Sequence, residues 1–450
     1  SIHSTAMRGA RRLLSRCAST KLEYRSSGRQ AAQLFSSVSD ESSSFHKFSR
    51  SSLGLESSLV RPVSAAIRQL PEVENAMEKF PSTRAVDDLK RASDVFSSFD
   101  KGGREHLAVQ ALLAECQQRL AIYDDAIVTL HELQDSLRSS ESRLAHNFEE
   151  DITLALAKVH WTRGNFNEAE TLCETIISTY DDLSESFSST NLHLASAMTG
   201  KALSQLEAMK TMDDAYSVRD FFRVAVKFLE RHPPKGNSLP QAASLSNAGV
   251  AEAIYNIYLQ ETNDVSVPMT PALRFLFQGL QKTAVSESSS RQILAASHAI
   301  EASIQANLAW GVLNYEEDRS DRLTKASEYA KTALTFYDAE GIIGKEGLSW
   351  VLTVVASCYH QAGSAVTAEG LFQSAVNKNE VSSDSLSLLQ LRYAHKEYAK
   401  LCMQWENREK DAENLTKEAN NIEASLPLNW QGKSSGIHGS LWFWTPGEFL

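Results

Sequence analysis

The sequence predicts an all-α protein, built as an α-solenoid of about seven helical hairpins. Its 450 residues exceed what one hydrophobic core normally organises, which favours several domains or one extended array. Only 10 Pro and 20 Gly, an apolar content of 42% and a lack of long alternating stretches favour helix throughout, with almost no strand. Residues 153–180 place small and large side chains where two antiparallel helices need them in order to pack. One extended array therefore explains the chain better than separate domains.

Residues 1–39 differ in kind from the rest of the chain. They carry a single acidic residue, Glu23, and a net charge of +6 from Arg8, Arg11, Arg12, Arg16, Lys21, Arg25 and Arg29. On a helix from Met7 the apolar residues share one face opposite the arginines, which is typical of a mitochondrial or plastid presequence. We expect a disordered organelle presequence here; a basic arm that binds nucleic acid or acidic lipid is the alternative.

The remaining chain is acidic. The net charge of −11 for the whole sequence becomes −17 for residues 40–450 once the basic segment is set aside. Repulsion from phosphates disfavours sequence-independent binding of nucleic acid, so we expect no nucleic-acid partner. No stretch reaches the roughly 18 apolar residues of a membrane helix, so we also expect no transmembrane segment.

Residues 40–56 are Ser-rich and aperiodic, and we interpret them as a flexible linker. Helical periodicity begins at about residue 57 and continues to residue 425. Within this range, residues 57–98 predict a pair of helices that caps the N-terminal end of the array.

Seven helical hairpins follow the capping pair. They are predicted at residues 104–137, 153–180, 192–231, 243–281, 297–338, 349–378 and 388–425. The anchors of the seven second helices lie 43, 49, 54, 54, 42 and 44 residues apart, at Ala126, Ala169, Val218, Ala272, Ala326, Ala368 and Ala412. These spacings are long for two-helix repeats and indicate long helices or loops.

Two of these units resemble tetratricopeptide repeats. In the first, the matching residues are Ala157, His160, Gly164, Phe166, Ala169, Cys173 and Ile176. In the second they are Ala356, Tyr359, Gly363, Ala368, Phe372 and Ala375. The segment GNFNEAETL is similar to the longer repeats of kinesin-light-chain type. In two other units Ala121 and Asn407 stand where a turn glycine is usual.

The resemblance implies a right-handed superhelix with a groove lined by the first helices, in which a partner binds. Chaperone-binding members of the superfamily hold a C-terminal carboxylate with Lys and Asn on first helices. The equivalent positions here are Ala111, Glu115 and Ala155, so we expect no such carboxylate clamp.

We find no catalytic or metal-binding motif. The string GKSSG at 432–436 is not a phosphate-binding loop, because Pro427 stands where the first glycine is required. None of the 12 histidines belongs to a metal-binding pattern, and His160 is expected to fill an aromatic position in its repeat. The cysteines Cys116, Cys173, Cys358 and Cys402 are expected to be buried thiols of a reducing compartment. We therefore predict no enzyme activity, no metal and no cofactor.

The aromatic tail, residues 426–450, contains three of the seven tryptophans, Trp430, Trp442 and Trp444. Either these side chains fold back onto the last repeats and cover the end of the core, or they bind a partner or membrane surface. The second hypothesis assigns partner binding to Leu441, Trp442, Phe443 and Trp444.

The sequence thus predicts a non-enzymatic protein-interaction scaffold, adaptor or assembly factor that is imported into an organelle. We expect the mitochondrion, in the matrix or associated with the inner membrane; a plastid is the alternative. An organellar RNA-binding helical-repeat protein and an accessory subunit of a large mitochondrial complex are the alternative functions.

Overall fold

A computed structural model describes residues 71–78, 82–99, 104–139, 145–181, 190–208, 212–233, 238–263, 270–284, 291–315, 319–340, 345–376 and 385–431. All of them belong to one unit of the chain, residues 49–450. The predicted presequence (1–39), the predicted linker (40–56) and residues 441–444 lie outside the described residues.

Regular structure in the described residues is helical, with sixteen α-helices and one short 3-10 helix. The first helices are α4 (Pro71–Glu78), α5 (Thr83–Phe99), α6 (Arg104–Arg119), α7 (Tyr123–Ser139), α8 (Ala145–Arg163), α9 (Phe166–Asp181), α10 (Thr190–Ala208) and α11 (Met212–Arg231). They are followed by α12 (Leu239–Asn263), α13 (Thr270–Lys282), α14 (Arg291–Tyr315), α15 (Arg319–Glu340), α16 (Lys345–Gln361), α17 (Ala365–Val376), α18 (Ser385–Met403), α19 (Glu409–Ser425) and the 3-10 helix η2 (Leu428–Trp430).

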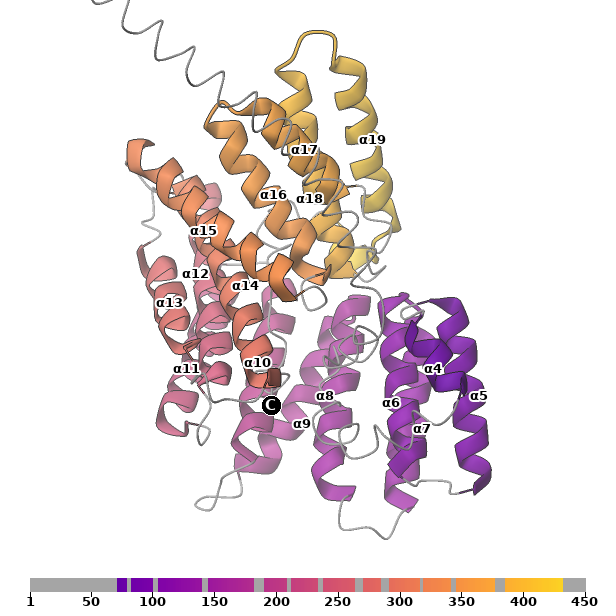
Figure 1. Ribbon diagram of the computed structural model, residues 1–450. Coiled ribbons are helices and arrows are strands. Elements are labelled where there is room, and N and C mark those ends of the chain that lie inside the picture. Colours follow the sequence, from indigo (N-terminus) through magenta and orange to yellow (C-terminus); the bar gives the residue numbers. More distant parts are fainter. Residues whose placement is uncertain are drawn as a thin grey trace, which may run out of the picture. The chain divides into compact units, whose positions relative to one another are not determined.

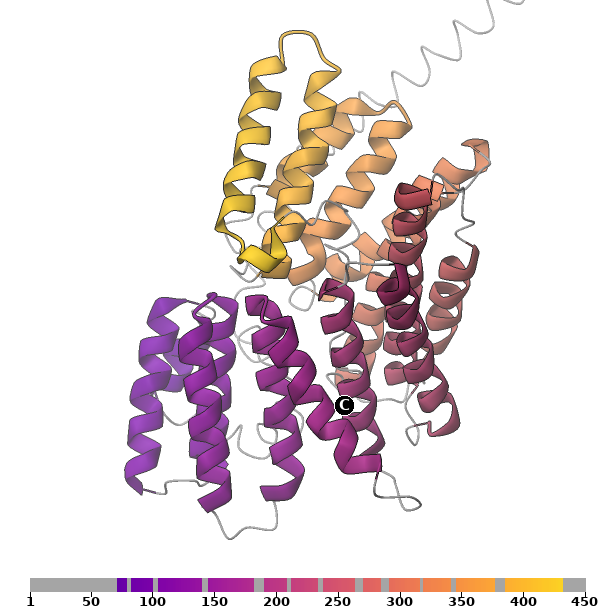
Figure 2. The ribbon, with the colours of Figure 1, turned by 180° about the vertical axis from the view of Figure 1, so that it is seen from behind.

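The helices pack in chain order. Each helix from α4 to α18 contacts the next one, and successive helices lie side by side in Figure 1 and, from behind, in Figure 2. The first helices from α8 onward also contact the first helix of the following pair. Seven hairpins, from α6/α7 to α18/α19, follow the pair α4/α5 in the described residues. The predicted all-α solenoid of about seven hairpins is confirmed.

A left-handed residue closes the turn of three hairpins. Gly164 has φ 88°, Gly363 has φ 78°, and Ala121 takes the same region with φ 59°. In each turn the amide of this residue bonds to the carbonyl three residues earlier, and the next amide bonds to the carbonyl five residues before itself. These bonds satisfy carbonyls that the end of a helix leaves free. Asn407, in the turn before α19, also has a positive φ of 63°.

The core runs between the helices as contacts of small and aromatic side chains. Ala169, Ala326, Ala368 and Ala412 are all buried on second helices, as their anchor positions predict. Large aromatic rings join the first helices of later hairpins: Trp350 on α16 lies 6.3 Å from Trp310 on α14 and 5.4 Å from Tyr393 on α18, between ring centroids. Alanine permits close helix approach and the aromatic rings fill the wider gaps, which is the alternation that close packing requires.

The second helices keep one face in solvent. On α19, for example, the buried residues are Ala412 and Ala419. Every second helix combines buried and exposed positions in its described residues, and on α19 the exposed ones are mostly charged or amide side chains. The outer face of the array is therefore supplied by these helices.

Candidate functional site

The predicted groove requires first helices with an open face, but four of them are buried over long stretches. Residues 106–118 of α6, 239–254 of α12, 302–313 of α14 and 349–358 of α16 are buried at every position. A partner lying along these helices would leave at least one stripe exposed in the free protein. The expectation of an open groove is therefore not met along these stretches.

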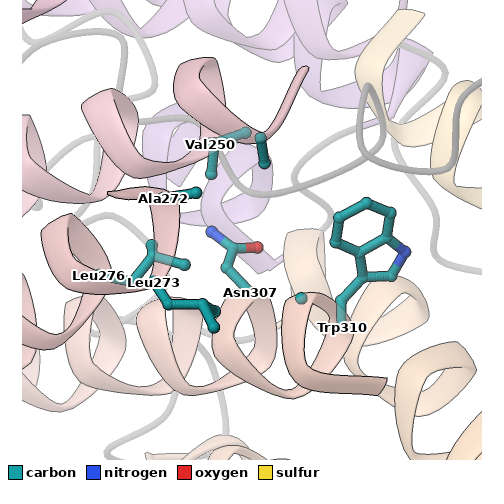
Figure 3. Close-up of a pocket in the computed structure, with 8 residues that line it drawn as sticks. Val250, Ala272, Leu273, Leu276, Asn307 and Trp310 are labelled. Carbon is teal, nitrogen blue, oxygen red and sulfur yellow. The ribbon is translucent and has the colours of Figure 1, made fainter. Parts of the chain in front are cut away.

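A pocket lies where α14 meets the preceding hairpin. It is lined by apolar side chains of α12, α13 and α14, and the amide of Asn307 points into it (Figure 3). Both polar atoms of the Asn307 side chain are buried without a hydrogen-bond partner. The cavity volume is about 10 Å³, which is room for one water molecule at most. This pocket is too small to bind a ligand.

A more specific arrangement surrounds the turn between α8 and α9. We call Trp161–Phe166 the helix-end site and Leu426–Trp430 the Trp430 segment. Trp430 has no exposed surface, although it lies at the end of the described chain. Its ring centroid lies 5.0 Å from that of Trp161 and 5.2 Å from that of Phe166, both in edge-on geometry. The two rings on either side of the turn thus enclose the indole of Trp430.

Hydrogen bonds fix the Trp430 segment on the free carbonyls at the end of α8. The indole Nε1–H of Trp430 donates to the carbonyl oxygen of Thr162 at 3.1 Å. The side-chain amide of Asn429 donates to the carbonyl oxygen of Gly164 at 2.6 Å. A Cβ atom on Gly164 would lie 3.3 Å from Cδ1 of Trp430, so glycine also gives the segment its close approach.

The start of α18 contacts the same end of α8. The hydroxyl of Ser385 donates to the carbonyl oxygen of Thr162 at 2.6 Å, and the amide of Ser385 donates to Oη of Tyr123 at 3.2 Å. The side-chain amide of Gln118, at the end of α6, donates to Oγ1 of Thr162 at 3.0 Å. The ends of two early hairpins are thereby joined to the last hairpin by polar contacts.

A charged bridge lies at the other end of α8. Nδ1 of His193 on α10 lies 3.0 Å from Oε2 of Glu150, and Nε2 lies 2.8 Å from Oδ1 of Asp151. The hydroxyl of Tyr180 on α9 donates to the same Glu150 oxygen at 2.6 Å. Burial opposes the charged imidazolium, but the hydrogen bonds to Asp151 and Glu150 raise the pKa of His193 to about 10. Burial also opposes the charge of Glu150, but the hydrogen bonds from His193 and Tyr180 lower its pKa.

This bridge joins three helices and leaves no open ligand position, because both ring nitrogens of His193 are engaged. Within the described residues, no group of three or more His, Cys, Asp and Glu side chains is placed to hold a metal ion. The arrangement therefore serves to hold α8, α9 and α10 together.

The residues singled out from the sequence behave as follows. Cys116, Cys173, Cys358 and Cys402 are buried free thiols, as predicted. Burial raises the pKa values of Cys116 and Cys358 to about 12, which keeps these thiols protonated and unreactive. His160 is half-buried at the end of α8, and burial lowers its pKa.

The carboxylate-clamp positions are Ala111, Glu115 and Ala155, and all three are buried. Glu115 is paired with Arg119 at 2.7 Å, so its carboxylate is engaged within α6.

The two hypotheses for the tail have different outcomes. Trp430 folds back as the first hypothesis states, and the two aromatic rings that enclose it, Trp161 and Phe166, belong to the second hairpin. The second hypothesis concerns Leu441, Trp442, Phe443 and Trp444, which lie outside the described residues, and it stays a prediction.

The helix-end site was not found from the sequence. One signal was present: Trp161 and Phe166 flank a turn glycine, which places two aromatic rings at one exposed corner of a hairpin. The occupant lies 265 residues further along the chain, and no local pattern connects the two.

None of the helices in the described ranges has the length and apolar character needed to cross a bilayer.

Comparisons with known proteins yield distant structural likenesses and no match to a known family. No protein family model and no curated protein matches the chain. Among solved structures, the chain is similar to the human IFIT1 dimer with m7Gppp-AAAA, at 14% sequence identity and a TM-score of 0.37. The match covers 77% of this chain and 66% of that chain, just under two thirds of its length. At this TM-score the likeness does not inform the function.

Proposed function

We propose that this chain is a non-enzymatic scaffold of the tetratricopeptide type that holds a protein partner. The observation that carries the proposal is the series of paired helices from α6 to α19 in the described residues, in which each hairpin packs on its neighbours. Such arrays bury their apolar stripes by stacking and expose a long outer surface. Binding another protein on that surface is the function that this architecture supports best. The turns at Ala121, Gly164 and Gly363 support the tetratricopeptide assignment.

Because long stretches of the first helices are buried, we place the partner on the outer edge of the last two hairpins. The turn after α16 and the turn after α18 are both solvent-exposed there. Nε2 of His360, at the end of α16, lies 2.8 Å from Oε1 of Gln404, in the turn after α18. Val366 is 74% exposed at the start of α17, and Met403 is 64% exposed at the end of α18. Exposed apolar side chains on a rigid edge are suited to contact with another protein.

The charges beside this edge are largely paired within the chain. Arg408 contacts Glu369 at 2.8 Å and also pairs with Asp411, so the edge combines two exposed apolar side chains with a satisfied ionic rim. A protein partner with a small apolar recess would match it. We propose this surface in addition to residues 441–444, which remain the aromatic anchor predicted from the sequence.

A photo-crosslinking experiment tests the proposal. The full chain, with a photoreactive residue in place of Gln373 on the exposed face of α17, is incubated with mitochondrial extract and irradiated. We expect one dominant crosslinked protein, which disappears in the double variant Val366→Asp, Met403→Asp. Val224→Asp, at a position 46% exposed on α11, is the matched control and should leave the crosslink unchanged.

Equal crosslinking of the double variant would contradict the placement, and no protein crosslink at any exposed position would contradict the scaffold. Retention of RNA by the purified chain in a low-salt filter assay would favour the RNA-binding alternative. Co-migration with a large complex on native gels would favour the accessory-subunit alternative.

We further propose that residues 1–39 direct import into mitochondria. The support is the net charge of +6 and the apolar face opposite the arginines. Replacing Arg8, Arg11, Arg12 and Arg16 by Gln should abolish uptake of the chain into a protease-protected fraction of isolated mitochondria. Unchanged uptake, or uptake by plastids alone, would contradict this assignment.

A further inference from the structure

We propose that the helix-end site is a peptide-binding site for a tryptophan preceded by asparagine, and that the Trp430 segment occupies it as a detachable ligand in cis. The inference deepens the proposed scaffold function and rests on it. The site is built from Trp161, Thr162, Gly164 and Phe166, and the ligand is the Trp430 segment, Leu426–Trp430.

The site recognises the segment through chemistry that a free peptide can reproduce. One indole enters between two aromatic rings, and two N–H donors reach two carbonyl oxygens at the end of a helix. Donors aimed at the free carbonyls of a helix terminus form favourable hydrogen bonds. The ligand class is thus a peptide that carries an indole and, one residue earlier, a side-chain amide.

The segment is compact enough to act as one unit. The amide of Trp430 bonds to the carbonyl of Pro427 at 2.8 Å, and the side chain of Gln431 donates to the carbonyl of Leu426 at 2.8 Å. Leu428 is 83% exposed, whereas Leu426 and Trp430 are buried, so the segment commits the indole, the Asn429 amide and the side chain of Leu426. A preorganised turn of this kind loses little conformational freedom when it binds.

The site does not need the segment in order to form. The turn at Gly164 closes with its own hydrogen bonds, from Gly164 to Trp161 at 2.9 Å and from Asn165 to His160 at 2.8 Å. The turn at Gly363 has the same two bonds, and a Cβ atom there would meet nothing within 4 Å. The turn at Gly363 shows that this backbone geometry forms without a segment packed over it. Removal of the Trp430 segment should therefore leave the helix-end site intact.

Detachment also has a defined consequence for the array. The Trp430 segment follows α19, and its contacts reach α8 across most of the array in sequence. Release would expose Trp161 and Phe166. Within the described residues, the hydroxyl of Ser385 would then be the group of the last hairpin that still bonds to Thr162.

A competition experiment on the full chain tests the proposal. The probe is a fluorescent hexapeptide of the sequence LPLNWQ, which copies residues 426–431, and its anisotropy is measured with the wild-type chain and with Trp430→Ala. In the wild type the cis segment occupies the site at high effective concentration, so we expect binding at least about 100-fold weaker than to Trp430→Ala. Saturable binding to Trp430→Ala supports the proposal.

Two controls define the site. The peptide LPLNAQ should not bind Trp430→Ala, and LPLNWQ should not bind Trp430→Ala combined with Phe166→Ala. The variant Asn429→Ala keeps the indole but loses the bond to Gly164, so its affinity for the probe should lie between those of the wild type and Trp430→Ala.

Several outcomes would overturn the proposal. One is a folded Trp430→Ala protein, judged by its helical circular dichroism, that binds the probe no better than the wild type. Another is equal binding with and without Phe166. If both Trp430→Ala and Asn429→Ala fail to fold, the segment is an integral part of the fold and the proposal is wrong. Because no partner protein is used, these failures are distinct from a failure of the scaffold function.

Discussion

The hairpins α8/α9 and α16/α17 have the same turn but different surroundings. Gly164 and Gly363 both adopt a positive φ, and each turn is closed by the same pair of backbone hydrogen bonds. Gly164 is buried under the Trp430 segment, whereas Gly363 is exposed. The backbone of the repeat therefore does not decide which turn is covered.

The side chains that flank the two turns explain the difference. Trp161 and Phe166 stand three residues before and two residues after Gly164, and the same positions around Gly363 are His360 and Ala365. The first pair supplies two aromatic walls for an indole, while the second supplies one imidazole, which is bonded to Gln404. The backbone of the repeat sets the geometry of the turn, and the side chains that flank the glycine determine what the turn can bind.

A second difference concerns how each hairpin joins the next first helix. Asp151 and Trp350 both lie 13 residues before their turn glycine. Asp151 belongs to a charged bridge with His193 on α10, whereas Trp350 packs on Tyr393 of α18 with 5.4 Å between ring centroids. One junction depends on protonation and the other does not.

The largest expected effect on stability comes from truncating Trp430, the side chain that covers the α8/α9 turn. Trp430→Ala removes a fully buried indole and should lower the free energy of unfolding by about 3–5 kcal/mol, the usual range for buried aromatic-to-alanine changes. Trp405→Ala, at a half-buried ring 5.5 Å from the Arg408 guanidinium, should cost about 1 kcal/mol. Urea denaturation followed by circular dichroism measures both, and equal losses would mean that Trp430 has no special role.

The turn glycines give the next effect. Alanine at either position must adopt a left-handed backbone, which costs about 1–2 kcal/mol. Gly164→Ala should cost about 1 kcal/mol more than Gly363→Ala, since its Cβ meets Trp430 at 3.3 Å and overpacking adds to the strain. Thermal unfolding of the two variants provides the comparison. In a Trp430→Ala background the two costs should become equal, and a difference that persists would contradict the contact as its cause.

The sequence predicts these hairpins well because their signals are local. Helical periodicity, buried alanine anchors and turn glycines lie within one unit, and they correctly place Ala121, Gly164, Gly363 and Asn407 in turns with positive φ. A hairpin is fixed by contacts between neighbouring residues, and a single sequence records such contacts.

Contacts between distant hairpins leave no such pattern in the sequence. Trp430 and the α8/α9 turn are far apart in the chain, and nothing near either one specifies the other. The buried state of the first helices did have a signal that was missed: residues 239–254 are rich in Ala, with a single charged residue, Glu252, and so no charged stripe. Helices that lack a polar face are typically enclosed on all sides, so an open groove was the wrong expectation there.

The charged junction distinguishes the two hairpins by pH. His193 has a pKa near 6.5 in an unfolded chain and about 10 in the folded one, so its contribution is complete below pH 6.5 and disappears as the pH rises to about 10. Glu150 has a lowered pKa, so its contribution is complete above its ordinary value and is lost as the pH falls through the folded value.

The alkaline loss should be about 2 kcal/mol, the scale of a hydrogen bond to a charged group. Denaturation of the wild type and His193→Gln at pH 6 and pH 10 measures it. The variant should be less stable at pH 6 and nearly equal to the wild type at pH 10. A constant difference at both values would show that His193 acts by shape alone. Tyr393→Leu, at the aromatic junction, is the matched control and should show no such pH dependence.

The smallest effect is a gain in stability at the turn of the first hairpin. Ala121 has the left-handed backbone that Gly164 and Gly363 adopt, with φ 59° and the same closing bonds, from Ala121 to Gln118 at 3.0 Å and from Ile122 to Gln117 at 2.9 Å. Ala121→Gly removes the strain of a Cβ atom in this region but increases the freedom of the unfolded chain, so the net gain should be about 0.5–1 kcal/mol. A rise in the melting temperature checks it.

Ala126→Gly, in the interior of α7, should instead destabilise the protein, because a helix interior gains nothing from a residue free to adopt positive φ. If Ala121→Gly lowers the melting temperature as well, the turn of the first hairpin is not equivalent to those at Gly164 and Gly363, and the comparison applies to two hairpins rather than three.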